Sequence, residues 1–401
     1  MVNIAVMGYG TVGSGVVEVM NTNHDKIASS AAQQIKVKYI LDVRDFSASP
    51  YKELFIKDFE IIENDPDIKI VVETIGGTGI AQEFTRRCLL AGKSVVTSNK
   101  ELVANHGHEL ITLAKERNLN YLFEASVGGG IPILRPISQC LAANEINEIY
   151  GILNGTTNYI LTRMIKNGVS MEEALAEAKY KGYAEKDPKD DIEGYDTCRK
   201  ICILSDLSFR RHIYPSQVPT KGISQVEARD VSLLAASGDR IKLVARAVRT
   251  GESSVAVYVE PHVVLKDNLL ANVEDVFNCI MVRGNAIGDT MFYGKGAGKL
   301  PTASAVVADV IDASKHINAR KYVDWSAGGP DAVTDSALLE NRMYIRAAIS
   351  PERVRELFGC IKVIDVNDTQ TAFMTEEVLD LYELREKIGD TRVFALYRVL
   401  D

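Results

Sequence analysis

The chain has 401 residues, of which 46% are hydrophobic and 25% are charged, and its formal net charge is −8 at pH 7. This length predicts two or three domains with a substantial core. The acidic balance argues against a dedicated nucleic-acid-binding protein, because neutralising phosphates requires a basic surface. No apolar run approaches the roughly 20 residues that span a bilayer, and the first residues lack the basic start of a signal peptide. We therefore expect a cytoplasmic protein with no membrane partner.

Residues 1–130 are predicted to form a domain in which strands and helices alternate, as in a parallel sheet covered on both faces. The expected strands are Val2–Met7, Lys36–Val43, Ile68–Thr74, Ser94–Thr97 and Tyr121–Glu124. The expected helices begin near Gly13 and cover Ile80–Ala91 and Glu101–Arg117. This pattern is typical of a Rossmann-like dinucleotide-binding domain.

The rest of the chain has a mixed pattern that makes the fold class α/β overall. Residues 131–330 predict an α+β domain, with helices at Met171–Lys181 and Tyr195–Asp206 and a β-rich run at Val255–Val264. Residues 340–401 are predicted to form a small β-α-β-β-α-β unit. Its expected elements are a strand at Arg342–Ile349, a helix at Pro351–Phe358, one or two strands within Ile361–Thr375, a helix at Val378–Ile388 and a strand at Thr391–Leu400.

A glycine motif, Gly8-Tyr-Gly10-Thr-Val-Gly13, follows the first predicted strand and opens a helix. In a dinucleotide site the first glycine permits the turn, the second lets the backbone approach a pyrophosphate, and the third lets the helix pack on the strand. The helix N-terminus then offers N–H groups to the anion. The strand before the motif and the helix after it favour this interpretation over a glycine turn that only packs.

The end of the second predicted strand bears on the choice of cofactor. An acid there binds the ribose 2′-hydroxyl of NAD, whereas an arginine binds the 2′-phosphate of NADP. The segment Leu41-Asp42-Val43-Arg44-Asp45 contains both residue types, so the sequence leaves NAD and NADP open. A solvated surface position for Arg44 is also open.

Two further segments suggest a substrate site. Small hydroxyl and amide residues cluster in Gly151–Ile160, which suits a pocket for an amino-acid carboxylate and equally suits a helix cap. Asp196 and Lys200 lie four residues apart at the start of a predicted helix, so they share a face. A lysine beside carboxylates can polarise an oxygen, although a surface ion pair would have the same spacing.

With these motifs, the chain resembles homoserine dehydrogenase along nearly its whole length. The matching segments are Gly8–Gly13, Thr97–Lys100, Glu124–Pro132, Gly151–Tyr159, Gly182–Pro188, Asp190–Asp196, Arg199–Lys200, Gly294–Gly298 and Pro301–Ser304. The resemblance implies reversible NAD(P)H-dependent reduction of L-aspartate 4-semialdehyde to L-homoserine, a step in threonine, methionine and isoleucine biosynthesis. The order of several distinct motifs is more specific than any one of them.

The resemblance also implies a role for each matching position. Lys200 is the catalytic lysine, held by Asp196, and Lys100 is a second lysine near the nicotinamide. Together with Asp196, the substrate-binding positions are Glu185, Asp191, Tyr183, Gly155 and Thr156. The cofactor-binding positions are Gly8, Gly10, Thr11, Val12, Gly13, Arg44, Lys100, Gly182 and Gly298. Arg44 matches the arginine of NADP-preferring members and so favours NADP(H), with NAD(H) still open.

A monovalent cation is implied in the same way, usually sodium. Its ligands would be the backbone carbonyls of Glu124, Val127, Gly129 and Ile131, and a glycine-rich bend that exposes carbonyls suits a hard ion. In the implied chemistry, hydride passes from NAD(P)H to the aldehyde carbon. Lys200 polarises the carbonyl oxygen and supplies the proton, directly or through water.

Residues 340–401 resemble a shortened ACT domain, a regulatory module. Ser350-Pro-Glu-Arg-Val354 stands where such modules have an Asp-x-x-Pro-Gly turn, so we expect a poor response to threonine and a unit dispensable for chemistry. The resemblance implies a homodimer or homotetramer, built through a catalytic and dimerisation domain at 131–330, with Val255–Val264 as a possible interface strand. Within that domain, residues 296–318 are expected to pack back on the nucleotide domain.

Two alternatives remain open at this point. One is another NAD(P)-dependent dehydrogenase of a small amino-acid-like substrate. The other is a catalytically silent nucleotide-sensing homologue, although Lys100, Glu185, Asp196 and Lys200 are all present.

Overall fold

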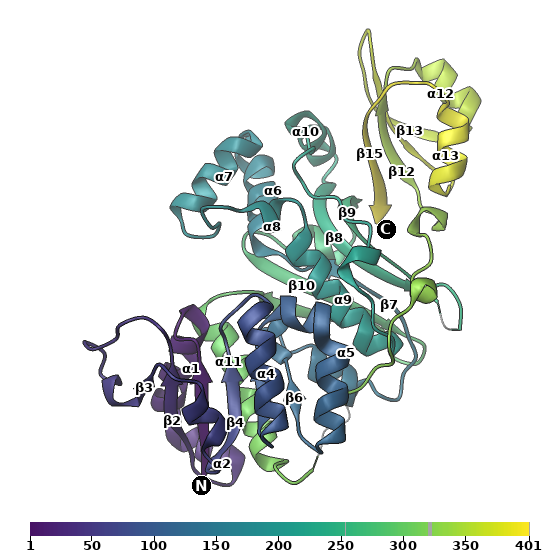
Figure 1. Ribbon diagram of the computed structural model, residues 1–401. Coiled ribbons are helices and arrows are strands. Elements are labelled where there is room, and N and C mark those ends of the chain that lie inside the picture. The colour runs from purple at the N-terminus through teal and green to yellow at the C-terminus, as the bar shows by residue number, and fades with distance from the viewer. Residues whose placement is uncertain (253, 320–322, 401) are drawn as a thin grey trace. The chain divides into compact units, whose positions relative to one another are not determined.

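A computed structural model describes residues 1–252, 254–319 and 323–400 (Figure 1). The chain forms two compact units, and each is assembled from three segments. Unit 1 contains residues 1–147, 199–215 and 283–332, and unit 2 contains residues 148–198, 216–282 and 333–400. None of the described helices has the length and apolar character needed to cross a bilayer.

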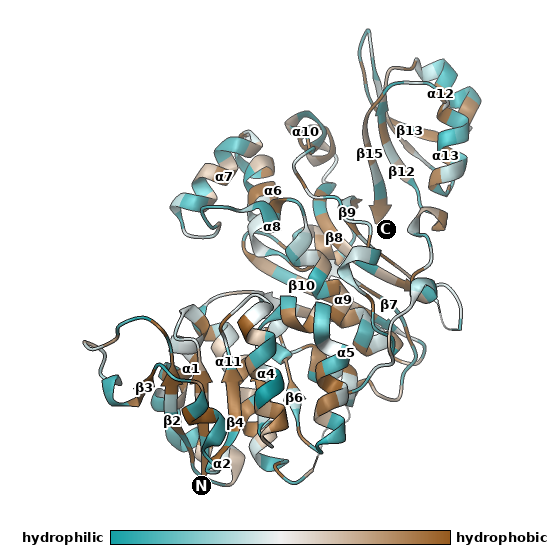
Figure 2. Ribbon diagram, viewed as in Figure 1, coloured by the Kyte–Doolittle hydropathy of each residue, from teal (hydrophilic) through white to brown (hydrophobic). Residues whose placement is uncertain are grey.

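Unit 1 is built on a parallel sheet in the order β3-β2-β1-β4-β5-β6, which is the strand order of a dinucleotide-binding fold. Its strands are β1 (Val2–Met7), β2 (Ile35–Leu41), β3 (Phe55–Ile56), β4 (Ile68–Glu73), β5 (Ser94–Thr97) and β6 (Tyr121–Leu122). Its helices are α1 (Thr11–Thr22), α2 (His24–Ala31), α3 (Glu60–Asn64), α4 (Gly79–Leu90), α5 (Lys100–Glu116) and α11 (Lys299–Lys315). The strands are apolar and buried between amphipathic helices, as the brown strands and partly teal helices of Figure 2 show.

The late helix α11 belongs to this first unit although it begins 177 residues after the end of β6 in sequence. Its residues Ala303, Val306 and Val310 pack in one core cluster with Val16 of α1 and Val6 of β1. The packing is close, because a Cβ added to Gly15 of α1 would lie 2.9 Å from the backbone oxygen of Lys299. Residues 296–318 therefore contribute to the core of the nucleotide-binding unit.

Unit 2 is built on a second sheet, in which the strands run β10-β7-β8-β9-β15-β12-β14-β13. These strands are β7 (Ile146–Ile152), β8 (Arg240–Arg249), β9 (Val255–Val264), β10 (Phe277–Gly284), β12 (Met343–Ala347), β13 (Ile361–Val366), β14 (Thr371–Thr375) and β15 (Val393–Leu400); β11 (Gly288–Lys295) follows β10 in the chain. The helices are α6 (Gly155–Asn167), α7 (Met171–Tyr180), α8 (Lys189–Ile192), α10 (Ala228–Ala236), α12 (Pro351–Phe358) and α13 (Leu381–Ile388), and α9 (Tyr195–Phe209) begins in unit 2 and continues in unit 1.

The C-terminal segment has the predicted β-α-β-β-α-β order, with two separate strands in the region 361–375. It does not stand apart from the rest of unit 2, because the end of β15 pairs in parallel with β9. Leu400 packs with Tyr150, Val244 and Val264 in the core of the middle segment. Dispensability for chemistry stays a prediction, but because the segment supplies a strand and a core side chain to the sheet of unit 2, we expect its removal to disturb that sheet.

The pairing of β15 also changes the interpretation of β9. We expected this β-rich run to offer a possible interface strand. One of its edges pairs with β8 over residues 255–264, and its other edge pairs with β15 over residues 262–264. Nearly all of its side chains are buried within the chain. Residues 262–264 of β9 therefore have no free edge for a partner strand.

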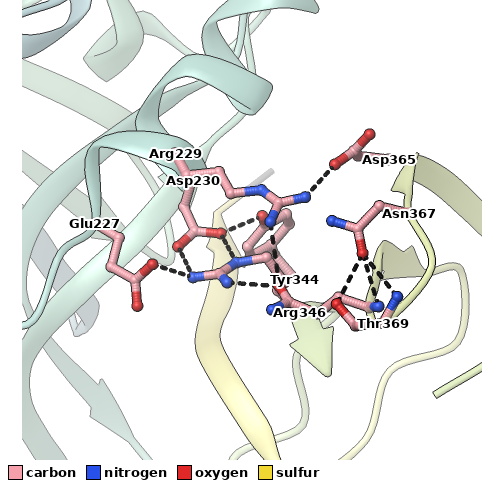
Figure 3. A network of polar contacts seen from close by, with 9 residues as sticks. Glu227, Arg229, Asp230, Tyr344, Arg346, Asp365, Asn367 and Thr369 are labelled. Carbon is pink, nitrogen blue, oxygen red and sulfur yellow. Dashed lines mark hydrogen bonds and ion pairs between the residues drawn. The ribbon is translucent and has the colours of Figure 1, made fainter. Parts of the chain in front are cut away.

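A buried polar network links α10 to the C-terminal strands (Figure 3). The Arg346 guanidinium on β12 donates to both carboxylate oxygens of Asp230, at 2.7 and 2.9 Å, and to Glu227 at 2.6 Å. The Tyr344 hydroxyl donates to Asp230 at 2.6 Å. Arg229 reaches Asp365 at 2.7 Å. This network and the β9–β15 pairing fasten the C-terminal segment to the middle of unit 2.

Candidate active site

The glycine motif forms a close-packed turn between β1 and α1. Gly8 has φ of +89°, and a Cβ on Gly13 would lie 1.9 Å from the backbone oxygen of Gly8. The Thr74 hydroxyl, just after β4, lies within hydrogen-bonding distance of the carbonyls of Met7 and Gly8, at 3.0 and 2.9 Å. Because Gly10 precedes α1 without a side chain to cap it, the first N–H groups of the helix suit an anion such as a pyrophosphate.

The acid and the arginine at the end of β2 interact with each other. Asp42 is buried and accepts hydrogen bonds from the backbone N–H of Tyr9 at 2.7 Å and from the backbone and guanidinium of Arg44 at 2.7–3.0 Å. These donors, chiefly the Arg44 guanidinium, hold the pKa of Asp42 well below its usual range. The Arg44 side chain is itself 58% exposed. The Asp42 carboxylate therefore binds groups of the protein itself, whereas the Arg44 side chain remains largely exposed to solvent.

Lys100 is the first residue of α5, directly after β5. Asn99 caps this helix by accepting a hydrogen bond from the Leu102 N–H at 3.0 Å. Gly8–Gly13, Arg44 and Lys100 thus follow the carboxyl ends of β1, β2 and β5, which meet at one edge of the parallel sheet. This is the edge at which open α/β sheets bind their ligands.

In unit 2, Asn154 connects the two acids that were predicted to bind substrate. Its side-chain amide donates to Asp191 at 2.7 Å and to Asp196 at 2.9 Å. Its side-chain oxygen caps α6 by accepting from Thr157 N–H at 2.9 Å. The segment Gly151–Ile160 is therefore both a helix cap and a polar site, the two interpretations that the sequence left open. Asn154 was missed as a site residue, because capping alone explained its presence.

The other predicted substrate positions lie close by in the chain. The Thr156 hydroxyl donates to the Tyr183 carbonyl at 2.7 Å, which ties the start of α6 to the loop after α7. A Cβ on Gly155 would lie 2.7 Å from the backbone oxygen of Val276, so the backbone packs closely there. Gly182 has φ of +73°, and Glu185 is exposed in the same loop.

Asp196 and Lys200 lie one turn apart on α9, and they are only 4% and 7% exposed. This burial excludes the interpretation of the two residues as a solvated surface ion pair. Charged groups are seldom buried without partners, since desolvating them is costly. For Asp196, one partner is the Asn154 amide.

The predicted cation loop is organised by its first residue, Glu124. The Glu124 carboxylate accepts the N–H groups of Ile133, Leu134 and Arg135 at 2.6–2.9 Å, so the carboxylate itself is already engaged. Gly129 has φ of +57°, and a Cβ there would lie 2.3 Å from the oxygen of Gly296. The loop is therefore held in a tight glycine bend.

The carbonyl oxygens of this loop are suited to a cation. Val127, Gly129 and Ile131 are buried. Across residues 1–252, 254–319 and 323–400, no hydrogen bond to their carbonyl oxygens is present. Buried carbonyls normally have a partner, and carbonyl oxygens are good ligands for hard cations. The donor set therefore fits the cation that the resemblance implied.

The arrangement of a parallel dinucleotide-binding sheet, a glycine turn at its carboxyl edge and a buried acid–lysine helix defines a nicotinamide-dependent oxidoreductase. Family models agree. Residues 8–124 match the model described as "Homoserine dehydrogenase, NAD binding domain", and residues 132–311 match the model described as "Homoserine dehydrogenase".

Similar proteins support the same assignment. Over 321 residues the chain is 41% identical to a homoserine dehydrogenase of Neisseria gonorrhoeae, covering 79% of this chain and 73% of that protein. Over 357 residues it is 40% identical to a homoserine dehydrogenase of Pseudomonas aeruginosa, covering 86% and 81%. The crystal structure of a homoserine dehydrogenase from Thiobacillus denitrificans superposes with a TM-score of 0.91 at 32% identity, covering 100% of this chain and 98% of that one.

A hyperthermophilic archaeal homoserine dehydrogenase in complex with NADPH matches with a TM-score of 0.65 at 30% identity, covering 78% of this chain and 97% of that one. The chain belongs to the homoserine dehydrogenase family. It is an NAD(P)-dependent oxidoreductase that interconverts L-aspartate 4-semialdehyde and L-homoserine, a reaction of amino-acid biosynthesis.

Proposed function

We propose that Lys200 is the catalytic lysine and that Asp196 positions it. The observation that carries this proposal is the burial of both residues on one helix turn, with Asp196 bound to the Asn154 amide. In this proposal Asp196, one turn from Lys200 and bound by Asn154, orients the lysine. An ammonium in such a setting donates a proton to the substrate oxygen as the aldehyde is reduced, and stabilises the oxyanion as it develops.

The acids around Asn154 complete the proposed substrate site. Asp191 and Asp196 share the Asn154 amide as a donor, which brings the two carboxylates together, and we assign to them the ammonium and hydroxyl of homoserine. Glu185, in the exposed loop after Tyr183, is proposed to join them when substrate binds. The bound nicotinamide supplies or accepts the hydride. The roles of the protein groups are to orient the substrate and to move its proton.

We propose that NADP(H) is the preferred cofactor, with Arg44 binding its 2′-phosphate and Lys100 lying near the nicotinamide. The oxygens of Asp42 already accept hydrogen bonds from Tyr9 and Arg44, so this acid is poorly placed to accept a ribose hydroxyl. The exposed guanidinium of Arg44 can instead form charge-assisted hydrogen bonds with a phosphate. The relative solved with NADPH is consistent with this proposal.

A monovalent cation, with sodium as the candidate, is proposed to bind the carbonyls of Glu124, Val127, Gly129 and Ile131. The support is that Val127, Gly129 and Ile131 are buried residues whose carbonyls accept no hydrogen bond from the described part of the chain. A cation there would fix the loop between β6 and the rest of unit 1. Melting temperature measured in sodium, potassium and tetramethylammonium chloride at equal ionic strength tests this, and equal melting in all three would contradict it.

The catalytic assignment is tested with Lys200→Ala. We expect kcat for homoserine oxidation to fall about 10²–10³-fold, a typical loss for an electrostatic catalyst, while the Kd for NADPH changes little. Lys36→Ala, at an exposed lysine of β2, is the control and should retain full turnover. Near-normal kcat in purified, folded Lys200→Ala would refute the role of Lys200.

A further inference from the structure

Glu73, the last residue of β4, is a fully buried carboxylate at the cofactor edge of the sheet. One of its oxygens accepts the N–H groups of Ile75 at 2.7 Å and Gly76 at 3.4 Å. The other accepts the hydroxyl of Thr97, the last residue of β5, at 2.6 Å. A single side chain thus holds the loop after β4 and the end of β5 together.

A second set of hydrogen bonds closes this connection. The Thr97 hydroxyl oxygen accepts from Asn99 N–H at 2.9 Å, and the Asn99 side-chain amide donates to the Gly77 carbonyl at 2.6 Å. Bonds therefore run from Glu73 through Thr97 and Asn99 to Gly77, and back along the chain to Glu73. The two bonds of Thr97 are buried, so breaking either one leaves a buried polar group without that partner, and this resists displacement of the strand ends.

The segments joined by these hydrogen bonds contain or adjoin the residues predicted to bind the cofactor. Asn99 caps α5, whose first residue is Lys100. Thr74, beside Glu73, holds the carbonyls of Met7 and Gly8. Gly76 and Gly77 have φ of +87° and +68°, and added Cβ atoms there would meet nothing within 4 Å, so this glycine loop faces open space. A backbone held in this way at the carboxyl edge can approach a flat ring closely.

We propose that Glu73 is a positioning residue for hydride transfer: through Thr97 and Asn99 it sets the geometry of the 75–77 loop and of Lys100 against the nicotinamide. The part that concerns Lys100 rests on the proposed function of that lysine. The chemistry needs no proton from Glu73. Its contribution is the placement of backbone and lysine, and a displacement of about 1 Å at such a site can cost about 10²-fold in rate.

A matched control variant in the β4 and β5 region distinguishes a positioning role of Glu73 from a role in stability alone. Lys93, just before β5, is also buried, and its ammonium donates to the carbonyls of Asp65 at 2.7 Å and Ile68 at 3.3 Å. It ties the β4 and β5 regions together at the amino edge of the sheet, whereas Glu73 does so at the carboxyl edge. Lys93→Met should therefore destabilise unit 1 without disturbing the cofactor site.

The experiment compares Glu73→Gln, Thr97→Val and Lys93→Met as full-length enzymes. Each is measured for melting temperature, Kd for NADPH, kcat and KM for homoserine, and the primary deuterium isotope effect on kcat. We expect Glu73→Gln to lower kcat about 10- to 100-fold, with KM for homoserine within about twofold and a larger isotope effect. Thr97→Val, a milder change that keeps the side-chain shape, should lower kcat in the same way. Lys93→Met should lower the melting temperature and leave kcat per folded enzyme unchanged.

Equal kcat per folded enzyme in Glu73→Gln and Lys93→Met would overturn the proposal, and so would a normal isotope effect in both Glu73→Gln and Thr97→Val. If Glu73→Gln fails to fold, Thr97→Val alone decides the question by the same criteria. The role of Lys100 is checked separately with Lys100→Ala. Normal turnover in that variant would remove Lys100 from the proposal, while a loss in Glu73→Gln would still show positioning by the 75–77 loop.

Discussion

Arg346→Met should destabilise unit 2 far more than an ordinary surface change, because it leaves a buried acid without its cation. The Arg346 and Asp230 side chains are 3% and 0% exposed, and Figure 3 shows their direct contact. After the substitution, Asp230 keeps only the Tyr344 hydroxyl among the donors it has in the intact network. Breaking a buried ion pair from one side typically costs about 3–5 kcal/mol, a large share of the roughly 5–15 kcal/mol by which proteins are stable.

Urea denaturation followed by circular dichroism measures this loss, and a double-mutant cycle assigns it. Asp230→Asn combined with Arg346→Met should cost less than the sum of the two single changes by about 1–3 kcal/mol. Arg353→Met is the control: Arg353 pairs with Glu356 on the exposed face of α12, and its loss should cost under about 0.5 kcal/mol. If Arg346→Met cost no more than Arg353→Met, the network would not fasten the C-terminal segment as argued.

Three further outcomes are expected. Arg44→Ala should weaken binding of NADPH more than of NADH in fluorescence titrations, since only NADPH carries the 2′-phosphate, and equal changes would contradict the assignment. Burial lowers the pKa of Lys242 to about 7, so between pH 7 and the ordinary lysine pKa the folded protein binds fewer protons than the unfolded chain. The free energy of unfolding of the wild type should therefore rise relative to that of Lys242→Met as pH increases from 7 to 10, by at most about 1.4 kcal/mol per pH unit. A difference in urea midpoints that stays constant with pH would disprove this. A chain truncated after Leu339 should lose the cooperative unfolding of unit 2 as well as activity, since β9 loses its partner β15; full activity in a folded truncation would instead confirm the dispensability expected from the sequence.

The nucleotide-binding half could be predicted because its signals are local. The apolar run Val2–Met7, the glycine motif and the following helix are contiguous in sequence, and the structure places β1 at Val2–Met7. Fully buried parallel strands are apolar throughout, so each stood out as a short hydrophobic run. Boundaries shifted by a few residues, as where the helix expected at Val378–Ile388 begins at Leu381 behind its cap Asp380.

The assembly of unit 2 could not be predicted, because it depends on pairings between distant segments. Nothing local in residues 391–400 indicates that the strand pairs with β9, more than 130 residues earlier. Periodicity shows that a strand has an apolar face, and does not show which strand lies beside it. The role of Asn154 was hidden for a similar reason: its acids, Asp191 and Asp196, lie about 40 residues away.

The hydrogen bonds that a polar group makes within the protein distinguish groups with a structural role from groups that can bind ligands. Residue type alone does not make this distinction. Asp42 looks like a ligand-binding acid in sequence, but in the structure protein donors already occupy it. Backbone N–H groups occupy the Glu124 carboxylate in the same way. The opposite holds for the exposed Arg44 side chain and for the carbonyls of the buried residues Val127, Gly129 and Ile131, which accept no hydrogen bond from the part of the chain that the structure describes. Unused capacity of this kind supports the proposals that Arg44 binds a phosphate and that the bend binds a cation. The same accounting makes Glu73, whose bonds are all internal, a group that acts through its neighbours and not on substrate.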